Sequence, residues 1–282
     1  MAELAPNPFR FPPFVVVSPQ MNQWALITGA SQGIGCALAR LFAAEGWNVI
    51  LVARDAARLG VVAEELRQKS DKALSVMVLP QDLTVPGAGQ LIFAAVQRER
   101  IVVNVLVNNA GFGFQGAFVE QDWQQELDLV QVNIVALMEL TRLFLPGMRE
   151  RGAGRILNVA STAAFLPGPY MALYYASKAF VYSFSNAVGR ELAGSGVTVT
   201  TLCPGLTATQ FHARAGQNRV GGFLQKMMGA DRVAEIAYRA LMAGRPRVTS
   251  GLLNHLVILI AKILPTWLIL RISGRFIAPP KR

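Results

Sequence analysis

The chain has 282 residues, of which 52% are hydrophobic and 16% are charged, a composition that supports a large folded core and argues against a disordered chain. Its formal net charge is +10, from 27 basic and 17 acidic residues, but the basic residues are scattered and form no cluster with aromatic ones. We therefore expect no nucleic-acid partner. The positive charge suits anionic cofactors or substrates, or a membrane surface.

The chain has few cysteines and histidines, which argues against a disulfide-stabilised protein, a metal-binding protein and an enzyme with a histidine-dependent serine nucleophile. The two cysteines, Cys36 and Cys203, indicate a reduced, cytoplasmic setting rather than a disulfide framework. The two histidines, His212 and His255, lie far in sequence from the motifs described below, and no Cys-x-x-Cys spacing occurs. We therefore expect neither a metal site nor a histidine-dependent serine nucleophile.

Residues 1–21 precede the first predicted strand and are rich in proline and phenylalanine. They lack the basic start and the uninterrupted apolar core of a signal peptide, so we interpret them as a loosely packed or disordered N-terminal arm. Met21 stands just before the first strand, which leaves open whether the arm belongs to the native start of the protein.

The first predicted strand, 24–28, leads into a turn that contains Gly29, Gly33 and Gly35, and an apolar helix then ends near Gly46. Glycines allow positive φ and close approach of the backbone, and a helix N-terminus offers free N–H groups to a phosphate. This order therefore fits a pyrophosphate cradle. The spacing Gly-x-x-x-Gly-x-Gly differs from the common dinucleotide fingerprint, so a plain tight turn remains the alternative.

Apolar strands and amphipathic helices alternate along the rest of the chain, with strands predicted near 24–28, 48–53, 74–79, 103–108, 155–160 and 197–202. Right-handed crossovers then give an α/β fold, a doubly wound parallel sheet of the Rossmann type with the ligand at the carboxyl ends of the strands. We predict one catalytic domain over 22–250. Within it, the stretch of about 206–229 lacks periodicity and is interpreted as a substrate lid.

Tyr174 and Lys178 lie four residues apart, so they share one face of a predicted helix. A free tyrosine has a pKa of about 10 and exchanges protons poorly at neutral pH. A neighbouring cation favours the phenolate, and a pKa shift of about three units takes roughly 4 kcal/mol, within reach of a close cation and a charged cofactor. The pair predicts an acid/base tyrosine. The spacing also occurs by chance in helices, so a packing role remains open.

Five motifs, in order along the chain, resemble the short-chain dehydrogenase/reductase family over about residues 22–250. They are the glycine turn 28–35, the segment 108–111 after the fourth strand, Asn133, Ser161 placed 13 residues before Tyr174, and Pro204–Gly205 followed by Thr209. The resemblance implies an enzyme that transfers hydride between a nicotinamide cofactor and a carbonyl carbon.

The resemblance also implies a role for each matched residue. Tyr174 is the acid/base, and Ser161 hydrogen-bonds the same substrate oxygen. Lys178 lowers the pKa of Tyr174 and holds the nicotinamide ribose, while Asn133 positions a water that connects Lys178 to solvent. For both residues a purely structural role remains open. Ser161 could be a turn residue at the end of the strand, with Thr162 as an alternative hydroxyl. Asn133 could be a helix residue whose side chain bonds its own backbone. The implied cofactor-binding residues are Gly29, Ser31, Gln32, Gly33, Ile34, Gly35, Arg54, Asp82, Asn109, Ala110, Gly111, Tyr174, Lys178, Pro204, Gly205 and Thr209.

The choice of cofactor is predicted from the end of the second strand. In NAD-dependent relatives an acidic residue there bonds the ribose 2′-hydroxyl, whereas this chain has Ala53 followed by Arg54. A guanidinium suits a 2′-phosphate, so we expect NADP(H). Asp55 is interpreted as the N-cap of the next helix, 56–69. Asp82 is similar to the family's adenine-binding aspartate.

The C-terminal extension, 251–282, is apolar with sparse cations. Lys262 and Pro265 disfavour a simple membrane-spanning helix, and cations among Trp and Leu suit a helix at a membrane surface. We predict two helices broken near Pro265 and packed beside the substrate mouth. Residues 252–277 are expected to cover the lid, a second subunit or lipid.

The sequence thus predicts a cytoplasmic NADP(H)-dependent oxidoreductase for an apolar small-molecule carbonyl or alcohol. One alternative is a membrane-associated reductase of long-chain acyl or lipid ketones. An alternative of another class is a non-catalytic NADPH-sensing binding protein, which the presence of both Tyr174 and Lys178 disfavours. Relatives usually associate through helices around 122–150 and 170–193, so we expect a homodimer or homotetramer.

Overall fold

The structure is a computed structural model that describes residues 23–69, 74–209 and 227–278. Within these residues, a parallel sheet has the order β3 (Val76–Pro80), β2 (Asn48–Ala53), β1 (Trp24–Thr28), β4 (Val103–Asn108), β5 (Gly154–Val159), β6 (Val197–Cys203) and β9 (Arg247–Thr249). This is the predicted doubly wound fold, in which the strand order reverses between β1 and β4. The predicted arm 1–21 and residues 210–226 of the predicted lid lie outside the described residues.

The observed strands differ from the prediction in bounds and in number. β3 begins at Val76 rather than at residue 74, and β5 begins one residue earlier than predicted. The last strand, β9, was not predicted, because three residues carry too little alternation to be recognised. β9 is recognised as a strand because it pairs in parallel with β6, with Thr249 opposite Cys203.

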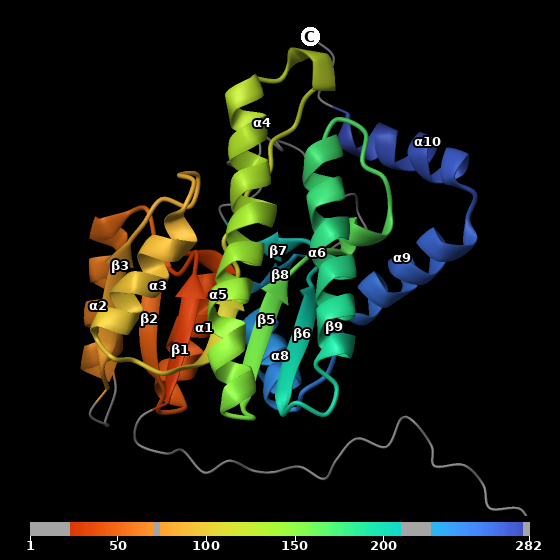
Figure 1. The fold of residues 1–282 in the computed structure, drawn as a ribbon. Helices are drawn as coiled ribbons and strands as arrows, with labels where there is room; N and C mark the ends of the chain where they lie inside the picture. The colour runs from red at the N-terminus through yellow and green to blue at the C-terminus, as the bar shows by residue number, and fades with distance from the viewer. Residues whose placement is uncertain (1–22, 70–73, 210–226, 279–282) are drawn as a thin grey trace, which may run out of the picture.

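Helices cover both faces of the sheet, with α5 and α6 in front of it in Figure 1 and α8 behind. One face carries α1 (Gly33–Ala44), α2 (Ala56–Lys69) and α8 (Ala230–Met242), and the other carries α3 (Ala88–Arg98), α5 (Ala136–Glu150) and α6 (Ala172–Glu191). In β1, Ala25 and Ile27 belong to the first core and Leu26 to the second. Because successive strand side chains point to opposite faces, one apolar run supplies both cores.

A continuous helical run, Trp123–Glu150, contains α4 (Trp123–Val130), the π-helical turn η2 (Gln131–Val135) and α5. By length and composition it is the one run in the described part of the chain that could cross a membrane. Its α5 portion, however, contributes Leu140 and Phe144 to the core against the sheet, and buried core helices of soluble proteins pass the same test. The π-helical turn is of interest because such turns often occur at functional sites.

Two further helices follow the last strand. They are α9 (Leu252–Ile263) and α10 (Thr266–Ile277), separated at Pro265, whose ring cannot continue the preceding helix. α9 packs against the 3-10 turn η3 (Thr162–Phe165), and the Ser273 hydroxyl of α10 donates to the Pro167 carbonyl at 3.3 Å. Figure 1 shows both helices at the side of the molecule next to α6.

The two ends of the predicted lid also pair with each other. β7 (Thr207–Ala208) and β8 (Met228–Gly229) form a short parallel ladder beside the main sheet. The described ends of the predicted lid therefore lie next to each other, close in sequence to the carboxyl end of β6.

Candidate active site

The glycine turn is joined to the end of β4 by Thr28. The Thr28 hydroxyl donates to the Val107 carbonyl at 3.2 Å and accepts from the backbone N–H groups of Asn109 and Ala110, both at 3.0 Å. In return, the Asn109 side-chain amide donates to the Thr28 carbonyl at 2.8 Å. These bonds hold the loops after β1 and β4 together at the point where the strand order reverses, which is where ligands bind in open α/β sheets.

Two glycines explain why this turn cannot carry ordinary side chains. Gly29 has a φ of +66°, which favours glycine, and a Cβ on Gly35 would collide with the Gly29 carbonyl. Helix α1 begins at Gly33, and its N-cap residue, Gln32, makes no side-chain cap hydrogen bond. The first-turn N–H groups therefore face the turn without a side-chain partner at the cap, as a phosphate site requires.

Tyr174 and Lys178 lie in the first two turns of α6, as the sequence predicted. The Lys178 Nζ atom is 5.8 Å from the centroid of the Tyr174 ring and donates to the Val159 carbonyl at 2.9 Å. Ser161 follows β5, and its hydroxyl bonds the Tyr174 side chain and accepts from the Ala163 N–H at 3.1 Å. The structure therefore brings the three predicted catalytic residues together.

Burial dominates the electrostatics of this cluster. It raises the pKa of Tyr174 to about 12, although the hydrogen bond with Ser161 lowers it, and it lowers the pKa of Lys178 to about 8. Both shifts favour the neutral form in the protein alone, and the ammonium is bonded to the Val159 carbonyl. The lowering of the Tyr174 pKa by Lys178 together with a charged cofactor stays a prediction.

Asn133 lies in the π-helical turn and is 1% exposed. Its Oδ1 accepts from the Phe112 N–H, and its Nδ2 donates to the Phe112 carbonyl and to the Ser177 hydroxyl, all at 3.0 Å. A Cβ on Gly111 would lie 3.1 Å from Asn133 Oδ1 and 3.3 Å from Lys178 Nζ, so Asn133 and Lys178 both border Gly111. The amide oxygen has a second lone pair, so the predicted water-binding role stays a prediction.

The junction of β2 and α2 carries the residues predicted to select the cofactor. Arg54 is exposed, and the Asp55 carboxylate accepts from the Arg58 N–H at 3.0 Å, so Asp55 caps α2 as predicted. Arg58 was not among the residues predicted from the sequence. Its side chain is 3.3 Å from the Asp55 carboxylate and donates to Gln32 Oε1 at 3.1 Å. Its position in the first turn of the helix that follows Arg54 could have indicated that the two arginines lie close together.

The remaining predicted cofactor residues lie on loops at the same edge of the sheet. The Asp82 carboxylate accepts from the N–H and the hydroxyl of Thr84, both at 3.0 Å. The Pro204 carbonyl accepts from the Thr162 N–H at 2.9 Å, next to Ser161. A Cβ on Gly33 would lie 3.1 Å from the Thr209 methyl group, so the turn after β6 approaches the glycine turn.

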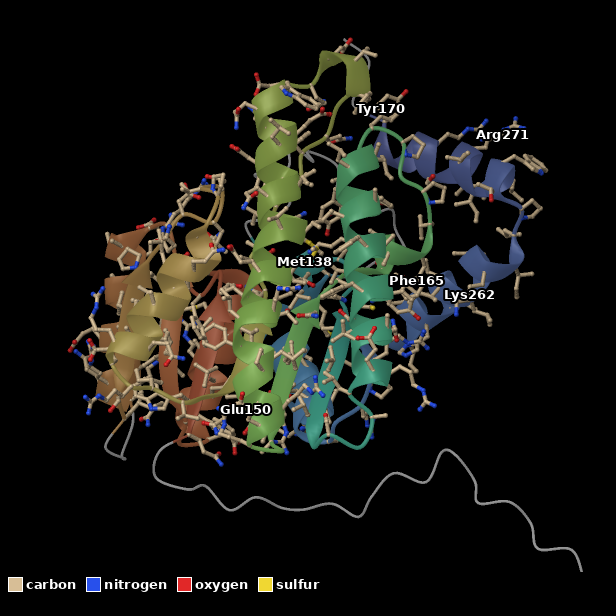
Figure 2. All side chains as sticks on the ribbon, viewed as in Figure 1. Met138, Glu150, Phe165, Tyr170, Lys262 and Arg271 are labelled. Atoms are coloured by element: carbon tan, nitrogen blue, oxygen red, sulfur yellow. The ribbon has the colours of Figure 1, made fainter. Side chains whose placement is uncertain are left out.

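The C-terminal helices contact these same loops. A Cβ on Gly205 would collide with the Asn254 side chain of α9, and the Gln115 side chain donates to the Ile277 carbonyl of α10. Lys262 Nζ lies 5.9 Å from the centroid of the Phe165 ring, and Figure 2 shows the two side chains next to each other. α9 and α10 therefore lie beside the site. No cluster of three or more His, Cys, Asp or Glu side chains occurs in the described ranges.

Fold and site together define a Rossmann-fold protein with a nucleotide-type glycine turn and a Ser–Tyr–Lys cluster at the carboxyl edge of its sheet. Comparison with known proteins identifies the family. Residues 23–220 match the model of the short chain dehydrogenase family, and the chain belongs to this family.

Several relatives illustrate the similarity. The chain is 37% identical to the ketoacyl reductase HetN of Nostoc sp. over 182 residues, which are 64% of this chain and 62% of that protein. It is 34% identical to the very-long-chain 3-oxoacyl-CoA reductase of Anas platyrhynchos over 200 residues, 69% of this chain and 62% of that protein. The match thus spans about three fifths of the length of each relative. A solved short-chain dehydrogenase from Sphingobium yanoikuyae in complex with NADPH has a TM-score of 0.75 and 31% identity, covering 86% of this chain and 96% of that one.

Proposed function

We propose that this chain is an NADP(H)-dependent oxidoreductase that interconverts a carbonyl group and a secondary alcohol. The observation that carries the proposal is the hydrogen-bonded pair Ser161 and Tyr174, with Lys178 one turn further along α6. This cluster borders the loops that join the glycine turn to β4, where a nicotinamide nucleotide would bind. The names of the relatives, a ketoacyl reductase and a 3-oxoacyl-CoA reductase, support the reaction class.

The residues present fit the cofactor. The start of α1 has no side-chain cap hydrogen bond, so its first-turn N–H groups suit a pyrophosphate, and the exposed Arg54 suits a 2′-phosphate. Arg58 adds a second guanidinium beside Gln32 of the turn. When bound, the reduced nicotinamide supplies the hydride.

The protein's own side chains would supply position and the proton. The raised pKa of Tyr174 keeps its phenol protonated at neutral pH, as donation to a carbonyl oxygen requires. Ser161, already bonded to Tyr174, would hold the same oxygen, and Lys178 would bond the ribose hydroxyls from the other side.

The test is a screen of aliphatic, aromatic and thioester ketones, with consumption of NADPH as the readout and NADH as the comparison. We expect turnover of apolar ketones with NADPH. Binding of NADPH without turnover of any ketone would favour the alternative, a nucleotide-sensing binding protein.

We further propose that the C-terminal helices contact an anionic membrane surface. Leu252, Ile263 and Trp267 are 90%, 72% and 64% exposed, and no acidic residue occurs between Gly251 and the end of the sequence. Lys262, Arg271 and Arg275 supply cations on the same two helices, and Figure 2 shows Arg271 pointing away from the body of the protein. Exposed Trp and Leu among cations are typical of helices in a membrane interface.

The length of these helices favours a position on the membrane surface over a membrane-spanning one. Each has 12 residues, about 18 Å at 1.5 Å per residue, well below the ~30 Å of a bilayer core.

Flotation with anionic and with zwitterionic vesicles tests the proposed membrane contact. We expect flotation only with anionic vesicles, and its loss at high salt. A protein that does not float at low salt contradicts the proposal, and flotation that persists at high salt indicates insertion instead.

We propose a homodimer or homotetramer that associates through the α4–α5 run and α6. Leu127, Val135 and Met138 of this run are 42%, 39% and 39% exposed, so it presents apolar side chains outward as well as inward. Sedimentation analysis of the wild type and of Met138→Lys tests the interface. We expect the substitution to favour a smaller species, and an unchanged sedimentation coefficient would exclude this surface.

A further inference from the structure

The pocket beside Tyr174 is almost filled by the protein itself. It lies between the 3-10 turn η1 (Phe118–Glu120), α4 and the start of α6. Its wall contains Phe114 and Gly116 from the loop after β4, and Met171 from the segment before α6. The free space inside is about 20 Å³, room for about one water molecule. A ketone is larger than one water, so this wall must move before a ketone can occupy the pocket.

Two loops form this wall, and they are bonded to each other. The Gly116 N–H donates to the Tyr170 carbonyl at 2.9 Å, which joins the loop after β4 to the segment before α6. Tyr170 has a φ of +64°, which is uncommon for a residue other than glycine. Such conformations persist only where the surrounding structure enforces them. The closed wall therefore depends on contacts made by both loops.

Helix α10 supplies contacts of this kind to both loops. The Gln115 side chain of the first loop donates to the Ile277 carbonyl, and the Ser273 hydroxyl donates to the Pro167 carbonyl of the second loop at 3.3 Å. A Cβ on Gly274 would lie 3.6 Å from the ring of Pro169. Figure 1 shows α10 next to the segment that leads into α6. α10 thus bridges the two loops that close the pocket.

The attachment of α10 to the rest of the protein is weak. Of its side chains that the structure describes, only Ile269 and Ser273 are buried, at 9% and 8% exposed, whereas Trp267 is 64% exposed. Pro265 separates α10 from α9, so α10 can move while α9 keeps its contacts with η3. Segments with few buried apolar contacts are the ones that open most readily.

We propose that α10 closes the substrate pocket and that an anionic lipid surface opens it. Release of α10 frees the two loops, and the wall beside Tyr174 can then widen. A ligand shifts such an equilibrium only by binding one state better. The released helix meets this condition, because it can bury Ile269 in lipid together with its outward-facing apolar side chains. The inference rests on the proposed reductase function and membrane contact, and adds that the first depends on the second.

The competing explanation is that α10 is a fixed wall of the site. The two explanations predict opposite effects when its contacts are loosened. A loosened wall holds a ketone less well and raises KM, whereas a loosened closure admits the ketone more readily and lowers KM. Truncation after Gly251 does not separate them, because it also removes the contacts of α9 with η3 and with the turn at Gly205.

The first experiment loosens α10 with Ser273→Ala, which removes the hydroxyl bonded to Pro167. Thr266→Ala removes a hydroxyl from an exposed position of the same helix and is the matched control. Without lipid, we expect kcat/KM for an apolar ketone to rise about twofold to tenfold in Ser273→Ala, the scale of one hydrogen bond. It should stay unchanged in Thr266→Ala. An equal or lower kcat/KM in Ser273→Ala overturns the closure.

The second experiment adds vesicles at low salt to the wild type and to Ser273→Ala. Zwitterionic vesicles control for partition of the ketone into lipid. We expect anionic vesicles to raise kcat/KM of both proteins to the same final value, so the gain is smaller in Ser273→Ala, which is already partly open. Both proteins should float equally. Equal activation by the two kinds of vesicle, or equal gains in the two proteins, overturns the opening by lipid.

Hydrogen exchange of the Gly116 amide gives a readout that needs no turnover, because this amide is bonded to Tyr170 in the closed wall. We expect faster exchange in Ser273→Ala than in the wild type, and faster exchange in the wild type on anionic vesicles. Unchanged exchange in both cases overturns the proposal. If no ketone is reduced, the reductase function fails alone and exchange still decides. If the protein does not float, the membrane contact and the opening by lipid fail, and Ser273→Ala still tests the closure.

Discussion

Tyr174 and Lys178 show how burial sets the chemistry of single residues. The low-polarity surroundings raise the pKa of the phenol to about 12 and lower that of the ammonium to about 8, so each group is shifted toward its neutral form. The Ser161 hydroxyl opposes the shift of Tyr174 without cancelling it. The phenol of Tyr174 is therefore protonated at neutral pH in the protein alone.

The first prediction concerns the proton donor. Tyr174→Phe removes the only phenol in hydrogen-bond contact with Ser161 among the described side chains, so turnover should fall to background while NADPH binding changes little. Kinetics with a ketone substrate and NADPH titration of the purified variant measure both effects. Tyr175→Phe is the control, since Tyr175 packs against Gly168, and it should remain active. Activity near the wild-type level in Tyr174→Phe contradicts the mechanism.

The second prediction concerns the buried lysine. Its pKa is about 8 in the folded protein against an ordinary value of 10.5, so between these pH values the unfolded chain binds more protons than the folded one. The free energy of unfolding therefore rises with pH across this window. Lys178→Met removes this contribution, so the wild type should gain stability relative to the variant as the pH rises from 8 to 10.

Urea unfolding at a series of pH values measures the difference between the two proteins. The series stops at pH 10, because the raised pKa of Tyr174 then acts in the opposite sense as the unfolded phenol ionises. Below pH 8 the difference should be constant. Parallel stability profiles from pH 7 to 10 would mean that the Lys178 pKa is not lowered in the folded protein.

At the scale of elements, the site depends on how strand ends meet helix starts. The Thr28 hydroxyl joins the ends of β1 and β4, and the side chain of Arg58 joins the start of α2 to the glycine turn before α1. The π-helical turn places Asn133 so that its amide bonds both the loop after β4 and Ser177 of α6. Each of these bonds links two secondary-structure elements, so the position of each side chain at this edge depends on a neighbouring element.

The third prediction concerns the junction of β2 and α2. Arg54→Ala should weaken NADPH binding by roughly 1.5–3 kcal/mol, the scale of a charge-assisted hydrogen bond, and leave NADH binding almost unchanged. Arg58→Ala should act in the same direction, because its guanidinium lies against Gln32 of the turn. Arg98→Ala, an exposed position on α3, is the control for loss of charge. Fluorescence titration with both nucleotides measures the effect, and equal weakening of both would refute a 2′-phosphate contact.

At the scale of the whole molecule, α9 and α10 extend the fold beyond its sheet. They contact η3 next to Ser161 and the loops around Gln115 and Pro167, yet much of their apolar surface faces outward. Monomeric soluble proteins rarely expose large contiguous apolar patches, so this surface is expected to have a partner. The inner side of the pair contacts η3 and the loops beside the candidate site, and Leu252, Ile263 and Trp267 are exposed on its outer side.

The fourth prediction concerns these two helices. Truncation after Gly251 removes their contacts with η3 and with the turn at Gly205, but leaves the glycine turn and Arg54 in place. We therefore expect the KM for an apolar ketone to rise severalfold or the solubility to change, and the Kd for NADPH to stay nearly constant. Steady-state kinetics and nucleotide titration distinguish the two constants. A parallel loss of nucleotide affinity would show that the helices stabilise the whole fold.

The fold class and most residues of the candidate site could be predicted from the sequence. Apolar strands alternating with helices define a doubly wound sheet, since only parallel pairing through right-handed crossovers buries both faces of each strand. Local spacing was sufficient for the glycine turn, for the Tyr174–Lys178 pair and for Asp55 as a helix cap, because each depends on residues within one turn or one helix.

Features that depend on contacts between distant segments could not be predicted from the sequence. β9 exists through its pairing with β6, and Arg58 reaches Gln32 across 26 residues of sequence. The pKa shift of Tyr174 likewise depends on distant segments, because burial by the whole fold raises it.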